Sequence, residues 1–298
     1  RHAPPLAHVA AEALLHLVKE TGASFSQDTW ASVCAELKSC FDGGPTALPP
    51  PSLSEEHSAQ GSDQLVAEVS RRVHKEAPPG SGPHELQVLL LSTVYQLLQL
   101  NYHLMKLADL EGLLNCLHSM YEKSHRAVAD ALAGREIPQT ELDEAMHLEL
   151  EAMSLYLQIL FMFFAKLTPD SQPQLQGDPP PLGSEEHTLL IAAASEYRLV
   201  SFCLHVLREY INAHNVAVGG GERAPFAQRM LTELTPSIVT LLGGILALHE
   251  HQFVRHLPGF YPLFVDLMHC DSKEIRELLR DIFSQRIGDV LHQRQQFL

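Results

Sequence analysis

Apolar residues recur every three to four positions along almost every segment of this 298-residue sequence, and no segment shows the alternation typical of a strand. The segment 109–132 is representative. Its apolar positions are Leu110, Leu113, Leu114, Leu117, Met120 and Tyr121. This spacing places the apolar side chains on one face of a helix of 3.6 residues per turn. The pattern predicts an all-α protein.

Start and stop signals divide the pattern into helices. We expect helices at about 6–21, 26–41, 63–76, 83–105, 109–132, 139–167, 185–214, 225–249, 258–270 and 272–291. Ser26 and Ser272 are predicted N-caps, and Phe25 and Trp30 are spaced to form a hydrophobic staple. Pro236 is expected to kink its helix, and Gly243–Gly244 to allow a close helix contact.

So many helices exceed what one bundle core usually holds, which favours an α-solenoid of stacked antiparallel helix pairs of HEAT or armadillo type. We interpret residues 1–298 as a single α-helical repeat domain. Stretches rich in proline, serine or glycine predict flexible insertions at about 42–61, 168–184 and 217–224. The sequence starts at Arg1 rather than at a methionine, so we expect a piece of a longer protein.

The charge is unevenly distributed. The formal net charge is −15, and residues 1–250 carry 30 acidic against 15 basic side chains, whereas residues 251–298 carry six of each. Such a negative surface repels phosphate backbones and anionic lipid, so the charge argues against nucleic-acid binding and direct electrostatic membrane docking. The five cysteines are scattered without a CxxC pair, which indicates a reducing compartment, no disulfide framework and no cysteine zinc site.

No segment reads as a membrane span. The uncharged stretch 86–105 contains seven polar residues, and the apolar stretch 155–167 has thirteen residues where a spanning helix needs about 20. We therefore predict helices buried within protein.

The histidines invite a metal hypothesis, which the spacing does not favour. His147 and Glu151 share a helical face without a third ligand on that helix, and the cluster of His249, His251 and His256 lacks the HExxH spacing. Cys34 lies on an apolar face without a base, which indicates a buried structural thiol. No nucleophile elbow, P-loop or dinucleotide motif occurs, so we predict no catalytic residues, no cofactor and no metal.

Two charged clusters are read mainly as solvated faces. The acidic block 141–151 is one of them, with a basic-partner surface as the alternative. The other comprises Arg71, Arg72 and Lys75 within RRVHK, which form the candidate partner surface.

The segment from Phe253 to Leu291, FVRHLPGFYPLFVDLMHCDSKEIRELLRDIFSQRIGDVL, resembles the extreme C-terminal segment of the large Arf guanine-nucleotide exchange factors of the brefeldin A-inhibited (BIG/Sec-seven) group. The signature residues are Phe253, His256, Phe260, Tyr261, Pro262, Arg276, Phe283, Arg286 and Gly288, with Leu263, Ile275, Leu279 and Ile287 also matching. Weaker similarity covers FSQDTWASVCAEL at 25–37 and LADLEGLLNCLHSMYEKSHRAV at 107–128.

The resemblance implies a regulatory HEAT-like tail. In that family, nucleotide exchange belongs to a separate domain with an FRLPGEAQ-like motif, which this sequence does not contain. The implied partners are small GTPases (Arf, Arf-like or Rab), other domains of the same exchange factor, and a second copy in a homodimer. The implied location is cytoplasmic and peripheral, on Golgi, trans-Golgi network or endosomal membranes.

The signature residues look structural first. Phe260, Tyr261 and Pro262 are expected to wedge between helices, with the aromatic rings buried and Pro262 opening a helix. Arg276 and Arg286 are about 80° apart around their helix, so we expect one to bond within the fold and the other to face outward.

Two other function classes stay open on the residues alone. A generic helical-repeat scaffold or transport adaptor would bind basic linear peptides with an affinity that falls as salt rises. A histidine-ligated metalloenzyme would contain stoichiometric metal. The resemblance favours the regulatory region of an exchange factor over both.

Overall fold

The computed structural model describes residues 6–43, 83–165 and 181–295, and every regular element within these ranges is helical, which confirms the predicted all-α class. The α-helices are α1 (Leu6–Thr21), α2 (Gln27–Gly43), α4 (Pro83–Asn101), α5 (Leu107–Leu132), α6 (Gln139–Phe164), α7 (Glu185–Gly219), α8 (Ala224–Leu246), α9 (Glu250–Leu267), α10 (Lys273–Asp281) and α11 (Gly288–Gln295). Short 3₁₀ turns η1 (Gly22–Ser24) and η3 (Tyr102–Leu104) and the π-helical turn η4 (Ile282–Ile287) complete them.

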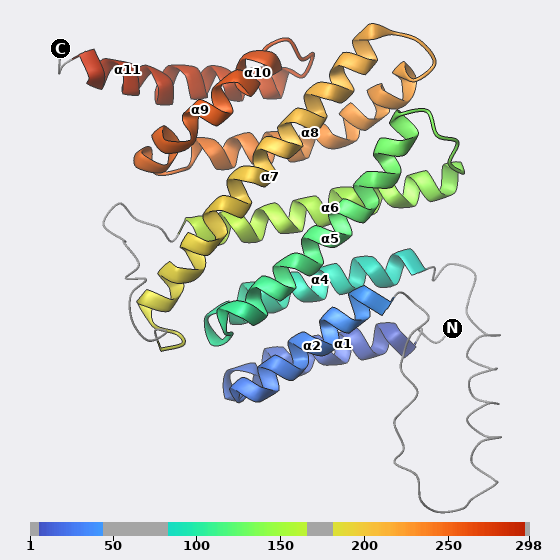
Figure 1. The fold of residues 1–298 in the computed structure, drawn as a ribbon, viewed down its shortest axis with the longest axis vertical. Helices are drawn as coiled ribbons and strands as arrows, with labels where there is room; N and C mark the ends of the chain where they lie inside the picture. The colour runs from blue at the N-terminus through green and yellow to red at the C-terminus, as the bar shows by residue number, and fades with distance from the viewer. Residues whose placement is uncertain (1–5, 44–82, 166–180, 296–298) are drawn as a thin grey trace, which may run out of the picture.

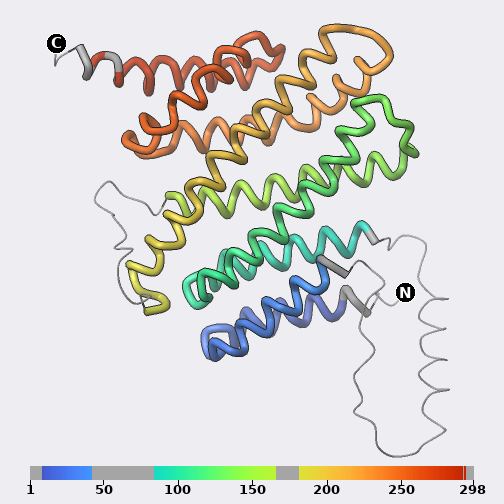
Figure 2. Tube along the Cα trace, viewed as in Figure 1, coloured from blue at the N-terminus to red at the C-terminus, as the bar shows by residue number. Residues whose placement is uncertain are grey.

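The helices stack in two rows (Figure 1). One row contains α1, α4, α6, α8 and α10, each packed on the next. The other contains α2, α5, α7 and α9; α2 packs on α5, α7 packs on α9, and the ring of Tyr121 in α5 meets that of Phe202 in α7 at 4.8 Å between centroids. The helices therefore form the predicted solenoid-like stack, with α1 and α11 at opposite ends (Figure 2).

One continuous apolar core runs between the rows. Leu91, Leu117, Leu160 and Leu241 are among its fully buried members. A Cβ added to Gly244 would lie 2.5 Å from the ring of Phe161, so α6 and α8 approach each other through this glycine. Gly243 has open space beside it, so only the second glycine of the predicted pair makes the close contact.

The predicted start signals form as expected. The hydroxyl of Ser26 accepts from the amide of Thr29 at 3.2 Å, and that of Ser272 accepts from the amide of Ile275 at 3.3 Å. The rings of Phe25 and Trp30 lie 5.2 Å apart between centroids, which confirms the staple.

Helix α9 differs from the prediction. It begins at Glu250 with His249 as its cap, and Pro258 and Pro262 lie inside it. The expectation that a helix starts at Pro258, and that Pro262 opens it, is therefore wrong. The cap and the buried face of α9 hold the helix together across both prolines, although each lacks an amide hydrogen.

The segment after α9 is one rod, residues 273–295, which we call the C-terminal rod. It comprises α10, η4 and α11 and is interrupted by the π-helical turn rather than continuously α-helical. A π-turn accommodates one extra residue and rotates the residues after it around the axis.

The predicted insertions lie largely outside the described residues. This holds for most of 42–61 and 168–184, and for the helix expected at 63–76. At 217–224, α7 continues to Gly219, and a turn containing Gly220 and Gly221 at positive φ leads into α8.

Two helices, α6 and α7, are long and apolar enough to span a membrane by length and composition, and 56% and 39% of their most apolar windows is buried inside the protein. Both helices pack on neighbours in the stack.

Candidate functional site

The signature residues gather where α8, α9 and the C-terminal rod meet. Phe253 is buried, and the guanidinium of Arg286 lies 5.0 Å from the centroid of its ring. Arg286 also donates to the backbone carbonyl of Leu248, just past the end of α8. One side chain of the rod thus holds the turn between α8 and α9.

Arg276 acts in a similar way at the other end of α9. Its guanidinium donates to the carbonyl of Cys270 at 2.6 Å, in the turn that leads into the rod. The sequence predicted that one arginine would bond within the fold and the other face outward. Both donate to backbone carbonyls, but Arg286 does so from a partly buried position inside the π-turn, whereas Arg276 is exposed and is the one that faces outward.

The signature histidine joins α9 to α7. Nε2 of His256 lies 2.8 Å from Oε1 of Glu196, and the same oxygen accepts from Arg255 at 2.9 Å. Glu196 thus receives bonds from two side chains of α9, which fixes the position of α9 on α7.

The aromatic part of the signature divides between core and surface. Phe260 is buried, as predicted, and its ring stacks on that of Phe264. Tyr261 is 46% exposed and Pro262 is exposed, so the expectation that both aromatic rings are buried is wrong for Tyr261. Tyr261 contacts the partly buried Phe283 edge-on at 6.1 Å between centroids.

Gly288, the last signature residue, starts α11 directly after the π-turn. A Cβ added there would lie 3.5 Å from the carbonyl oxygen of Phe283, an ordinary contact. Its role is compatible with packing alone.

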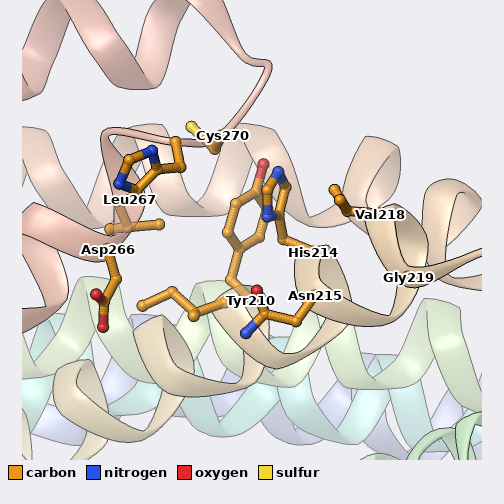
Figure 3. A pocket seen from close by; sticks show the side chains of 10 residues that line it. Tyr210, His214, Asn215, Val218, Gly219, Asp266, Leu267 and Cys270 are labelled. Atoms are coloured by element: carbon orange, nitrogen blue, oxygen red, sulfur yellow. The ribbon is translucent and has the colours of Figure 1, made fainter.

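A groove of about 520 Å³ lies beside this region, between the last turns of α7 and the end of α9 (Figure 3). Helix α7 contributes Tyr210, Ile211, His214, Asn215, Val218 and Gly219, and the end of α9 and its turn contribute Asp266, Leu267, His269 and Cys270. The groove is not predictable from the sequence signals, because it depends on α7 continuing beyond the predicted helix end at 214.

The groove offers hydrogen bonds and one carboxylate. Nε2 of His214 is buried without a partner among the described residues. The hydroxyl of Tyr210 bonds Oγ1 of Thr235 at 3.0 Å, and Asp266 is exposed. Burial raises the pKa of the Cys270 thiol, so little thiolate is present at neutral pH. The arrangement suits binding of a polar or basic side chain.

A second polar cluster, which we call the central node, joins α5, α6 and α7 through His125, Glu149 and Glu209. Nδ1 of His125 lies 2.7 Å from Oε1 of the buried Glu149, and Nε2 lies 3.9 Å from Oε2 of Glu209. The prediction that the acidic block 141–151 is a solvated face is therefore wrong at Glu149. A carboxylate is tolerated there because an imidazole pairs with it.

The environment of the central node sets its protonation. Burial would lower the pKa of His125, but the hydrogen bond to Glu149 and the charges of Glu149 and Glu209 outweigh it and raise the pKa. Burial and the neighbouring His125 lower the pKa of His205, whose ring lies 5.2 Å away. Of these two imidazoles, His125 is therefore the one that carries positive charge more readily.

The predicted histidine groups do not assemble a metal centre. Nδ1 of His147 lies 3.0 Å from Nε2 of His84 in α4. His249 and His251 stack, whereas His256 bonds Glu196. Within the described ranges, no group of three or more His, Cys, Asp or Glu side chains is placed to hold a metal ion.

Cys34 is buried, as predicted, and burial raises its pKa to about 12, which makes it a poor nucleophile. The candidate partner surface of Arg71, Arg72 and Lys75 lies outside the described residues.

Comparisons with known proteins agree with the C-terminal signature. The family model of the BIG2 C-terminal domain matches residues 85–284. The chain is 23% identical to brefeldin A-inhibited guanine nucleotide-exchange protein 3 of Arabidopsis thaliana over 96% of its own length and 16% of the relative's. It is also 23% identical to protein 2 of that name from the same plant, over 97% of the chain and 18% of the relative. The chain thus spans under a fifth of these relatives. No solved structure matches significantly.

Proposed function

Because the chain belongs to the BIG2 C-terminal domain family, we propose that it is a non-catalytic, regulatory and partner-binding region of an Arf guanine-nucleotide exchange factor. One observation carries the proposal: the family match covers residues 85–284 and includes most of the C-terminal signature. The region would regulate exchange through contacts with GTPases or with other parts of the exchange factor. Its site of action would be the cytoplasmic face of Golgi, trans-Golgi network or endosomal membranes, with peripheral attachment.

Two further observations support a binding role. The FRLPGEAQ-like motif of the exchange domain is absent from the 298-residue sequence. The charged side chains of the signature, Arg276, Arg286 and His256, bond within the fold. These side chains shape the end of the stack and leave its outer surfaces for partners.

The test is a pull-down with the complete chain as bait. Arf, Arf-like and Rab GTPases, each loaded with a non-hydrolysable GTP analogue or with GDP, and the remaining region of the same exchange factor are the candidate partners. We expect at least one GTP-loaded GTPase, or the remaining region, to be retained above a bead control. Retention of none of them would contradict the proposal.

A scaffold for basic linear peptides is the second candidate, and the groove between α7 and α9 favours it. The exposed carboxylate of Asp266 borders the groove, and His214 is also among its lining residues. A lysine-rich peptide should then bind with an affinity that falls as salt rises, and Asp266→Asn should weaken it. Salt-insensitive binding to a folded GTPase would favour the first candidate instead.

A further inference from the structure

The side of α9 that faces away from α7 is apolar and exposed. Tyr261, Val265 and Met268 are 46%, 41% and 45% exposed, and we call these three residues the α9 stripe. Tyr261 and Val265 lie in α9 and Met268 is its C-cap in helical conformation, so their spacing of four and three residues places them on one face of the helix. Single exposed apolar residues are normal on a protein surface, whereas three in succession along one helix form a patch.

The direction of the stripe follows from a glycine. A Cβ added to Gly259 would lie 3.6 Å from Leu204 of α7, so Gly259 faces α7. Tyr261 lies about 160° from Gly259 around a helix of 3.6 residues per turn. The stripe therefore points away from α7, along the direction in which the solenoid stacks.

Within the described residues, α9 is the last member of the row α2, α5, α7, α9. The other row ends with the C-terminal rod, whose exposed side chains include Lys273, Glu277 and Arg280. The first two of these form an ion pair at 3.6 Å. The end of a solenoid needs a polar outer face. The rod provides one, and α9 does not.

The stripe also continues an interface that already exists inside the protein. Tyr261 contacts Phe283 of the rod edge-on, and Phe283 is only partly buried. A helix lying on the stripe would touch both α9 and the rod, as α7 touches both α8 and α9.

The size of the stripe decides between possible occupants. The exposed parts of the three side chains amount to roughly 300 Å², well below the approximately 800 Å² per partner of a stable protein–protein interface. One helix with apolar residues at matching spacing needs only this much surface. Residues 251–298 carry equal numbers of acidic and basic side chains, so charge does not select the occupant.

We propose that the α9 stripe docks one amphipathic helix of a partner protein, which extends the row α2, α5, α7, α9 by one member. The apolar face of the partner helix covers Tyr261, Val265 and Met268. This goes beyond the proposed function, because it requires neither a GTPase nor a basic peptide.

The test uses the complete chain and a fluorescent model helix of roughly 18 residues, or about five turns. The peptide has leucines on one face and equal numbers of lysine and glutamate on the other. A scrambled peptide of the same composition is the peptide control. We expect fluorescence anisotropy to show binding of the helix with a Kd on the order of 10 µM, changing little when salt rises from about 0.1 to 0.5 M. The scrambled peptide should not bind.

Two matched variants locate the binding. Val265→Asp places a charge in the stripe, whereas Val9→Asp adds the same charge at a similarly exposed position, 43%, of α1 at the other end of the stack. We expect Val265→Asp to weaken binding about tenfold or more and Val9→Asp to leave it unchanged. Both variants should unfold at the wild-type temperature, because both positions are exposed.

Other outcomes would overturn the proposal. These are equal binding by the two variants, and equal binding of the scrambled peptide. A dimer of the wild type that Val265→Asp dissociates in sedimentation would show that a second copy covers the stripe. Sedimentation of the wild type, but not of Val265→Asp, with phosphatidylcholine vesicles would show that a membrane covers it. If no GTPase is retained in the pull-down while the model helix still binds the stripe, only the proposed function is contradicted.

Discussion

The central node and the C-terminal end both hold charged groups against the core, but they neutralise the charge in different ways. In the central node, a titratable imidazole of His125 meets the buried carboxylate of Glu149. At the C-terminal end, Arg276 and Arg286 donate to backbone carbonyls of Cys270 and Leu248. Guanidinium stays protonated at every accessible pH, and imidazole does not. A change of pH near neutrality therefore alters the stability of the central node and leaves that of the C-terminal end unchanged.

The largest effect should come from removing the ring on which the C-terminal end is built. Phe253→Ala leaves a cavity in the core and removes the face beneath Arg286. We expect the free energy of unfolding to fall by about 3–5 kcal/mol, measured by urea unfolding. A loss below about 1 kcal/mol would show that the C-terminal end does not depend on this stack.

The next variant tests whether the C-terminal end is independent of pH. Arg286→Met keeps much of the apolar stem and removes the hydrogen bond to Leu248 and the contact with the Phe253 ring. We expect a loss of about 2 kcal/mol in the free energy of unfolding, equal at pH 5 and pH 8. A loss that differs between these pH values would contradict the comparison.

Glu149→Gln tests the opposite behaviour in the central node. The folded-state pKa of His125 is raised above its ordinary value of 6.5, so the pair contributes stability below that value and loses it as pH rises through the raised pKa. We expect the substitution to lower the free energy of unfolding by about 1–2 kcal/mol near pH 6 and by less at pH 8.

The matched control for this variant is Glu209→Gln. Glu209 is 3.9 Å from His125 and more exposed, so its loss should be smaller at both pH values. Chemical denaturation across the pH range measures both variants. A Glu149→Gln loss that grows with pH would reverse the assigned sign.

The smallest effect should come from the α9 stripe. Tyr261→Ala removes a half-exposed ring whose main contact is the edge of Phe283. We expect the free energy of unfolding to fall by about 0.5–1 kcal/mol, measured in the same urea experiment as Phe253→Ala. A loss as large as that of Phe253→Ala would mean that the stripe supports the fold rather than being free for a partner.

The sequence predicts those structural features that depend on residues close together in the chain. The caps at Ser26 and Ser272 and the staple of Phe25 with Trp30 form because each depends on residues three to five positions apart. The apolar period of each helix likewise needs no knowledge of its neighbours. Helix content and the stacked architecture follow from these local signals.

The structural features that the sequence does not predict depend mainly on contacts between residues distant in the chain. The burial of Glu149 depends on His125, which lies on another helix, so the acidic block looked uniformly solvated. Proline usually opens helices, and at Pro258 that local rule loses to the cap at His249 and the buried face of α9. None of the start, stop or spacing signals marks the π-turn at 282–287, which contains Arg286.

The two prolines inside α9 also determine whether a contact on that helix can be purely apolar. Neither Pro258 nor Pro262 has an amide hydrogen to give to the carbonyl four residues earlier, on Val254 and on Pro258 respectively. Both oxygens sit on the same side of the helix as Tyr261 and Val265. A partner helix with a purely apolar face would offer these two oxygens no hydrogen-bond donor. A partner helix that carries an asparagine or glutamine amide would donate to them and would be selected over partners without one.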